Sequence, residues 1–175
     1  MRLPASLTFI AAMLIAACTT PYSMHGGSPH ILTAACKGQD TDTDCYIVVD
    51  AWMTASDSCA AEVVKSQETV AFKKNAPDKW IQWKLTDSSV DENFRFTGNG
   101  IAPKSTPADN ATKWRANFTN GGTIQNDKVF RWKNLNSSSV TTTSDYLYMV
   151  SVELRRPHLA PLACKLQDPV IRNQR

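Results

Sequence analysis

Hydrophobic side chains at every second position are the feature of this chain that most restricts its fold. The clearest case is the stretch 145–154, in which Tyr146, Tyr148, Val150, Val152 and Leu154 occupy the even positions. Successive side chains of a β-strand point to opposite faces, so this alternation predicts a strand with one face in the core.

Shorter stretches show the same period and are separated by polar turns. The expected additional strands cover 45–52, 68–72, 80–85, 93–97, 113–118 and 129–133. The stretch 57–64 is interpreted instead as one or two helical turns that begin at Asp57. About seven short strands without a long amphipathic helix predict an all-β fold, an antiparallel β-sandwich of immunoglobulin-like arrangement.

The first 17 residues have the organisation of a secretory signal. Arg2 supplies a positive charge, the run 7–15 is largely apolar, and Ala16 and Ala17 are small. These are the three regions of a cleavable signal peptide. The apolar run is too short to span the roughly 30 Å of hydrocarbon in a bilayer as a helix.

The residues Ile15-Ala16-Ala17-Cys18 resemble the lipobox of bacterial lipoprotein precursors. That resemblance implies that Cys18 receives a diacylglycerol before cleavage, and that Thr19 after it directs the protein to the outer membrane. Acyl chains then hold the protein at the bilayer. We therefore expect a signal peptide over 1–17, a lipidated flexible tether over 18–34 and a β-sandwich domain over 35–175.

The five cysteines agree with this division. An odd number is unusual in an exported protein, and lipidation of Cys18 leaves an even set of four: Cys36, Cys45, Cys59 and Cys164. An oxidising compartment favours two disulfides, for which three pairings are possible. We favour Cys36 with Cys45 and Cys59 with Cys164. Zinc is not expected, because paired C-x-x-C and neighbouring histidines are lacking.

Basic and aromatic residues alternate in four of the expected strands, for example in the stretches 79–84 and 130–133. This pattern is compatible with a platform for single-stranded nucleic acid or a glycan, but a half-buried strand produces it as well. Loss of Arg2 with the signal leaves 18 basic against 16 acidic residues, a net charge of about +2. We therefore favour core aromatics with solvated cations, and expect no nucleic-acid partner.

The sequence offers only weak candidates for a metal site and for a catalytic residue. Asp40, Asp42 and Asp44 alternate as at the start of a calcium-binding loop, but Cys45 replaces the turn glycine and Ala51 the closing glutamate. His158 is the one histidine of the expected domain, and it lies in a proline-rich loop without a recognisable nucleophile motif. We expect no metal, no cofactor and no catalytic residue, with a hydrolase that uses His158 kept as a minor alternative.

The Trp-rich strand near Trp83, the late Tyr-x-Tyr-x-Val strand and the ending 168–173 resemble small exported bacterial β-sandwich domains without an established activity. That resemblance implies a fold but no function. Together these features predict a lipoprotein of the outer membrane that faces the periplasm and binds a protein partner as an adaptor. The alternative is a periplasmic inhibitor or immunity protein that acts against a toxin or a wall hydrolase.

Overall fold

The computed structural model describes residues 30–39, 41–74, 76–136, 143–166 and 169–174. The elements, in chain order, are β1 (Cys45–Ala55), β2 (Ser58–Val63), η1 (Lys65–Gln67), β3 (Thr69–Phe72), β4 (Lys79–Leu85), α1 (Asp87–Asp91), β5 (Phe94–Pro103), α2 (Asn110–Asn117), β6 (Phe118–Ile124), β7 (Val129–Asn134), β8 (Ser144–Leu154), β9 (Leu162–Ala163), β10 (Lys165–Leu166) and β11 (Val170–Asn173). The signal peptide, Cys18 and most of the expected tether lie outside the described residues.

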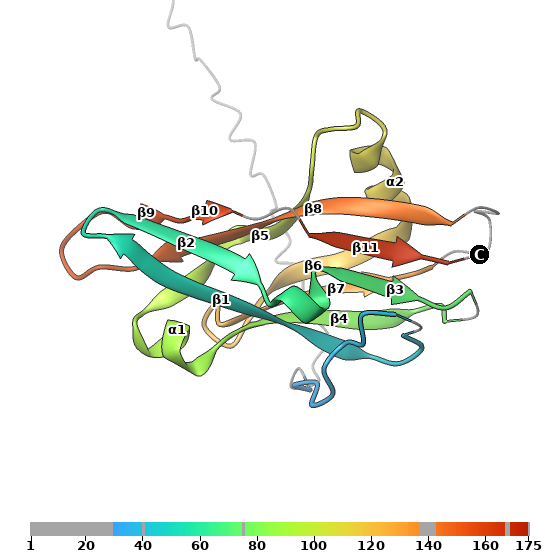
Figure 1. Cartoon of the computed structure of the whole chain (residues 1–175), viewed down its shortest axis with the longest axis horizontal. Helices are drawn as coiled ribbons and strands as arrows, with labels where there is room; N and C mark the ends of the chain where they lie inside the picture. The colour runs from blue at the N-terminus through green and yellow to red at the C-terminus, as the bar shows by residue number, and fades with distance from the viewer. Residues whose placement is uncertain (1–29, 40, 75, 137–142, 167–168, 175) are drawn as a thin grey trace, which may run out of the picture.

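The strands form two sheets that pack face to face (Figure 1), so the predicted all-β sandwich is confirmed. The six-stranded sheet has the order β10-β2-β1-β4-β7-β6, and the five-stranded sheet contains β3-β11-β8-β5 with β9 paired to the end of β8. The inner faces of both sheets carry the apolar side chains that the alternation assigned to the core.

The sheets are mixed rather than purely antiparallel, which differs from the expected immunoglobulin-like arrangement. β1 pairs in parallel with β4, β2 with β10, and β3 with β11. Between β1 and β4 the chain forms β2 in the same sheet and then β3 in the other sheet. It therefore re-enters the first sheet in the direction of β1, and this crossover produces the parallel pair.

Two local predictions were wrong. The stretch 57–64 is strand β2 and not a helical turn, because Cys59, Ala61 and Val63 alternate toward the core and a tight turn pairs β2 with β1. The stretch 113–118 is mostly helix α2 and not a strand. Trp114 and Phe118 are four residues apart, so they share a helix face, and their rings stack with centroids 4.0 Å apart.

Large aromatic side chains fill the space between the sheets. Trp83 of β4 donates a hydrogen bond from Nε1 to the hydroxyl oxygen of Tyr148 at 3.1 Å, and the two rings meet edge to face. Phe94, Phe96 and Phe130 are also buried. The aromatic members of the alternating basic and aromatic stretches thus belong to the core for the most part, as the sequence indicated.

Both expected disulfides are present. Cys36 is bonded to Cys45, which closes the loop before β1. Cys59 of β2 is bonded to Cys164, which lies between β9 and β10. The second bond joins residues 105 positions apart and fixes the C-terminal segment to the six-stranded sheet.

The residues His30–Cys36, which we call the strap, run along the outer face of the six-stranded sheet. The buried side chain of Gln82 in β4 accepts a hydrogen bond from the amide of Leu32 at 2.9 Å and donates one to the carbonyl oxygen of His30 at 2.8 Å. Tyr46 exchanges backbone hydrogen bonds with Ala34 and Cys36. The end of the expected tether is therefore part of the folded domain.

Candidate functional site

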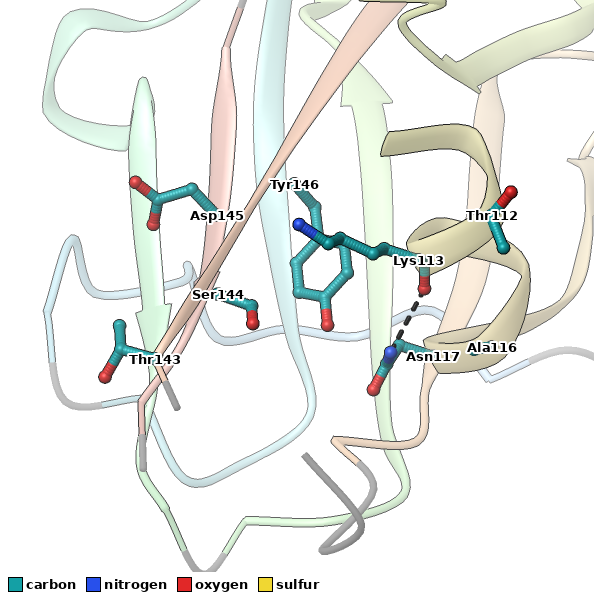
Figure 2. A pocket seen from close by; sticks show the side chains of 8 residues that line it. All are labelled: Thr112, Lys113, Ala116, Asn117, Thr143, Ser144, Asp145 and Tyr146. Carbon is teal, nitrogen blue, oxygen red and sulfur yellow. Dashed lines mark hydrogen bonds between the residues drawn. The ribbon is translucent and has the colours of Figure 1, made fainter. Parts of the chain in front are cut away.

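A cavity of about 560 Å³ lies between α2 and the beginning of β8 (Figure 2). Its lining combines hydroxyl, amide and charged side chains with one aromatic ring: Thr112, Lys113, Ala116, Asn117, Thr143, Ser144, Asp145 and Tyr146. Its volume is within the usual range for small-molecule sites in proteins. The cavity is thus large enough for one or two side chains of a partner or for a small ligand.

Helix α2 is held in place from both ends, which makes its side of the cavity rigid. At the first turn, Asn110 is buried; its amide nitrogen donates to the carbonyl oxygens of Lys104 and Leu147 at 2.9 and 2.8 Å, and its Oδ1 accepts from the amide of Leu147 at 3.2 Å. In the middle, Trp114 is inserted into the aromatic core. At the last turn, the chain continues directly into β6 at Phe118.

Asn117, at the end of α2, has a buried side-chain oxygen without a hydrogen-bond partner among the described residues. Its side chain is 2% exposed, and its amide nitrogen donates to the carbonyl oxygen of Lys113 at 3.1 Å (Figure 2). Its Oδ1 has no hydrogen-bond partner among the described residues. A buried acceptor that stays unsatisfied costs about 1–3 kcal/mol. Asn117 is in the cavity lining, so a donor that reaches this oxygen from the cavity would remove the cost.

The indole nitrogen of Trp114 is also buried and without a partner among the described residues, but Trp114 does not line the cavity. The ring of Trp114 lies among Phe118, Trp132, Tyr146 and Tyr148, and it is not part of the cavity lining. Nε of Arg156, the third such atom in the described part of the chain, belongs to the loop after β8 and does not line the cavity either. Of these three residues, Asn117 is the one in the cavity lining.

The charged groups around the cavity are already paired. Asp145 accepts two hydrogen bonds from the guanidinium group of Arg172, at 2.6 and 2.8 Å, and this interaction holds the pKa of its carboxyl below the usual range. Lys113 is 2.5 Å from the carboxylate of Asp109, one turn earlier on the chain. Their hydrogen bond lowers the pKa of Asp109 and raises that of Lys113.

This arrangement restricts the chemistry of a ligand. Lys113 is paired with Asp109, and Asp145 is paired with Arg172. The charged side chains of the lining are thus neutralised by their partners and do not favour an ionic ligand. The unsatisfied atom is an acceptor, and the ring of Tyr146 is buried, which leaves no exposed aromatic face for stacking. The cavity therefore suits a neutral group that donates hydrogen bonds, such as an amide N–H.

His158 lies far from this cavity. It is exposed in the loop between β8 and β9, with a φ of 61°, and the loop follows the end of β8 at Leu154. The cavity is at the other end of that strand, which has 11 residues and is thus roughly 35 Å long. The structure does not bring His158 together with the cavity residues.

The two described carboxylates of the calcium-like stretch have other partners. Asp42 pairs with Lys73 at 3.2 Å, and Oδ1 of Asp44 accepts from the backbone amide of Trp80 at 2.9 Å. Asp40 lies outside the described residues. Across the described part of the chain, no group of three or more histidine, cysteine, aspartate or glutamate side chains is placed to hold a metal ion.

The sequence did not indicate Asn117 or Asp145 as site residues. Asn117 fell in a stretch interpreted as a strand, where its side chain would have pointed to solvent. A signal was available in the spacing of Asn110, Trp114, Asn117 and Phe118, which fall on one helical face at steps of four, three and one. Polar residues at both ends of such a face are typical of a short helix fastened to a core.

In the ranges that the structure describes, no helix has the length and the apolar character needed to cross a membrane. Comparison of the chain with models of known protein families, and with curated protein sequences, finds no match.

Proposed function

We propose that this chain is a lipid-anchored protein of the bacterial outer membrane that faces the periplasm and binds a protein partner without catalysing a reaction. The lipobox Ile15-Ala16-Ala17-Cys18 supports the anchor. The two disulfides support an oxidising compartment, in which such bonds persist.

The observation that carries the binding role is the unsatisfied Oδ1 of Asn117 in the wall of the α2 cavity. A neutral donor from a polypeptide, either a backbone N–H or a side-chain amide, fits this acceptor. The hydroxyl group of Thr112 in the same lining can donate or accept a further hydrogen bond. Helix α2 is rigidly fastened, so little conformational entropy is lost when a partner binds.

The anchor is tested in the producing cell by incorporation of labelled palmitate and by fractionation of membranes. We expect the wild-type protein to be labelled and to sediment with the outer membrane, and the Cys18→Ser variant to be neither labelled nor retained after washing. An unlabelled wild-type protein would overturn the anchor.

The cavity is tested by affinity capture from envelopes with two variants of α2. Asn117→Leu removes the acceptor at similar volume, whereas Arg115→Gln changes an exposed residue of the same helix that does not line the cavity. We expect the partner to be captured by wild type and Arg115→Gln, and at least tenfold less by Asn117→Leu.

Equal capture by all three proteins would refute the role of the cavity, provided that thermal unfolding shows Asn117→Leu to be folded. A second variant, Ala116→Trp, blocks the cavity without touching the amide of Asn117. If Ala116→Trp binds like wild type, the partner does not enter the cavity.

A further inference from the structure

The strap determines on which side of the sandwich the anchored end of the chain lies. Gln82 holds the backbone of His30 and Leu32, and Nζ of Lys84 donates to the carbonyl oxygen of Leu32. Farther along, the buried amide of Gln67 donates to the carbonyl oxygen of Cys36 at 3.0 Å. The chain therefore enters the domain along the outer face of the six-stranded sheet.

The distance from this face to the anchor is short. His30 comes 12 positions after Cys18. Twelve residues span at most roughly 40 Å, whatever their conformation. A lipidated Cys18 would thus keep the outer face of the six-stranded sheet close to the bilayer.

This outer face carries aromatic rings paired with cations. Nζ of Lys84 lies 4.1 Å from the ring centroid of Tyr46, and the guanidinium carbon of Arg131 lies 4.8 Å from that of Trp80. Trp52 belongs to the same face, since the even positions of β1 point outward, and it is 37% exposed. Tryptophan, tyrosine and long basic side chains combine an apolar body with a polar end, which suits the headgroup region of a bilayer.

The charged side chains on two adjacent strands of this face, β4 and β7, are all positive. The outward positions of β4 and β7 carry Lys84, Arg131 and Lys133, and neither strand contains an Asp or Glu. Lys133 is partly compensated by Asp78 at 3.2 Å. The acidic outward residues of this sheet, Asp50 and Glu62, are on the neighbouring strands β1 and β2.

We propose that the outer face of the six-stranded sheet, with Trp80, Arg131 and Lys133 beside the strap and Trp52 at the far end of β1, lies against the anionic phospholipid surface to which the chain is anchored. This inference rests on the lipid anchor of the proposed function. Helix α2 lies on the opposite side of the sandwich from the strap (Figure 1). The cavity beside α2 is then directed away from the membrane, toward the periplasm.

The test uses the full lipidated protein in vesicles of phosphatidylcholine and phosphatidylglycerol whose acyl chains carry bromine, which quenches nearby tryptophan fluorescence. We expect quenching in wild type, and loss of most of it in Trp52→Phe/Trp80→Phe. The matched control adds Met149→Trp to that double variant, because Met149 is an outward residue of β8 in the other sheet. We expect no quenching from this new tryptophan.

Equal quenching from Met149→Trp, or none from Trp52 and Trp80 in a protein that stays bound to vesicles, would overturn the orientation while leaving the anchor intact. A protein that does not bind vesicles at all and lacks palmitate would overturn the anchor instead. The role of charge is tested with the Arg131→Gln variant and with the lipid composition. We expect Arg131→Gln to show less tryptophan quenching than wild type in the mixed vesicles, and still less in vesicles of phosphatidylcholine alone. Quenching that is independent of both changes would refute anionic lipid as the partner of this face.

Discussion

The two disulfides should stabilise the fold to very different extents, because they close loops of very different length. Cys59 and Cys164 are 105 residues apart, whereas Cys36 and Cys45 are 9 apart. In the chain-entropy description of a crosslink, these separations correspond to about 4.8 and about 2.6 kcal/mol at 25 °C. The long-range bond should therefore contribute about 2 kcal/mol more to the free energy of unfolding.

The comparison is made between Cys59→Ala/Cys164→Ala and Cys36→Ala/Cys45→Ala. Both are prepared in a Cys18→Ser background, which removes the fifth thiol and with it the proposed site of acylation from every protein. All four structural cysteines are buried, so the cost of removing sulfur atoms from the core is similar for the two pairs. Equilibrium unfolding in urea gives the free energy of unfolding from the midpoint and the slope.

We expect the variant without the long-range bond to be the less stable of the two by about 2 kcal/mol, which at an ordinary urea slope is a midpoint lower by roughly 1 M. Equal midpoints, or a lower midpoint for the variant without Cys36–Cys45, would show that loop length does not govern the effect. In that case local packing of the strap against β1 would be the dominant contribution of the short disulfide.

Two further substitutions examine the core and an edge strand. Asn134 of β7 and Asn173 of β11 exchange two hydrogen bonds between the sheets, at 2.8 and 3.1 Å, and both are fully buried. We expect Asn173→Ala to lower the free energy of unfolding by about 1–3 kcal/mol, because it leaves Asn134 buried without its partner. The double variant Asn134→Leu/Asn173→Leu should lose less stability, since no polar partner is left behind. An Asn173→Ala protein as stable as wild type would contradict this. Gly121 of β6 is packed against Trp132, where an added Cβ would lie 2.4 Å from the indole ring, whereas one at Gly122 would contact nothing within 4 Å. Gly121→Ala should therefore cost about 1–3 kcal/mol in urea unfolding and Gly122→Ala about 0.5 kcal/mol or less, so that equal effects would refute the packing argument.

The alternation of hydrophobic residues was sufficient to predict most of the strands of the sandwich and their buried faces. Every second residue is buried from Cys45 to Ala51 in β1 and from Tyr146 to Leu154 in β8, as the alternation in their sequences indicates. Cys36–Cys45 and Cys59–Cys164 also followed from the sequence as the favoured pairing. These features depend on local pattern, or on the small number of ways in which four cysteines pair.

The helix α2 could not be recognised by the same argument. The run from Lys113 to Phe118 alternates polar and apolar residues, and it places Trp114 and Phe118 four apart, so it satisfies both the period of a strand and that of a helix. The tertiary structure decides between them, because Asn110 and Trp114 bind to groups on distant strands. The cavity depends on that helix, so it was not predictable either.

The parallel pairs were missed for a related reason. Whether β4 runs with or against β1 depends on the path of the chain through β2 and β3, and nothing in the residues of β4 itself records that path. The order of strands is likewise a property of non-local pairing. Alternation indicates which face of a strand is buried, but not its neighbours.

The last strand has a consequence for how the protein reaches its final state. β11 comprises the residues Val170–Asn173, and it is inserted between β3 and β8 rather than added at an edge. Until these last residues are available, β3 and β8 each have an open side, and the carboxamide of Asn134 has no counterpart across the core. A chain that lacks Val170–Asn173 therefore exposes two unpaired strand edges at once. The five-stranded sheet is complete only when β11 has taken its place between β3 and β8.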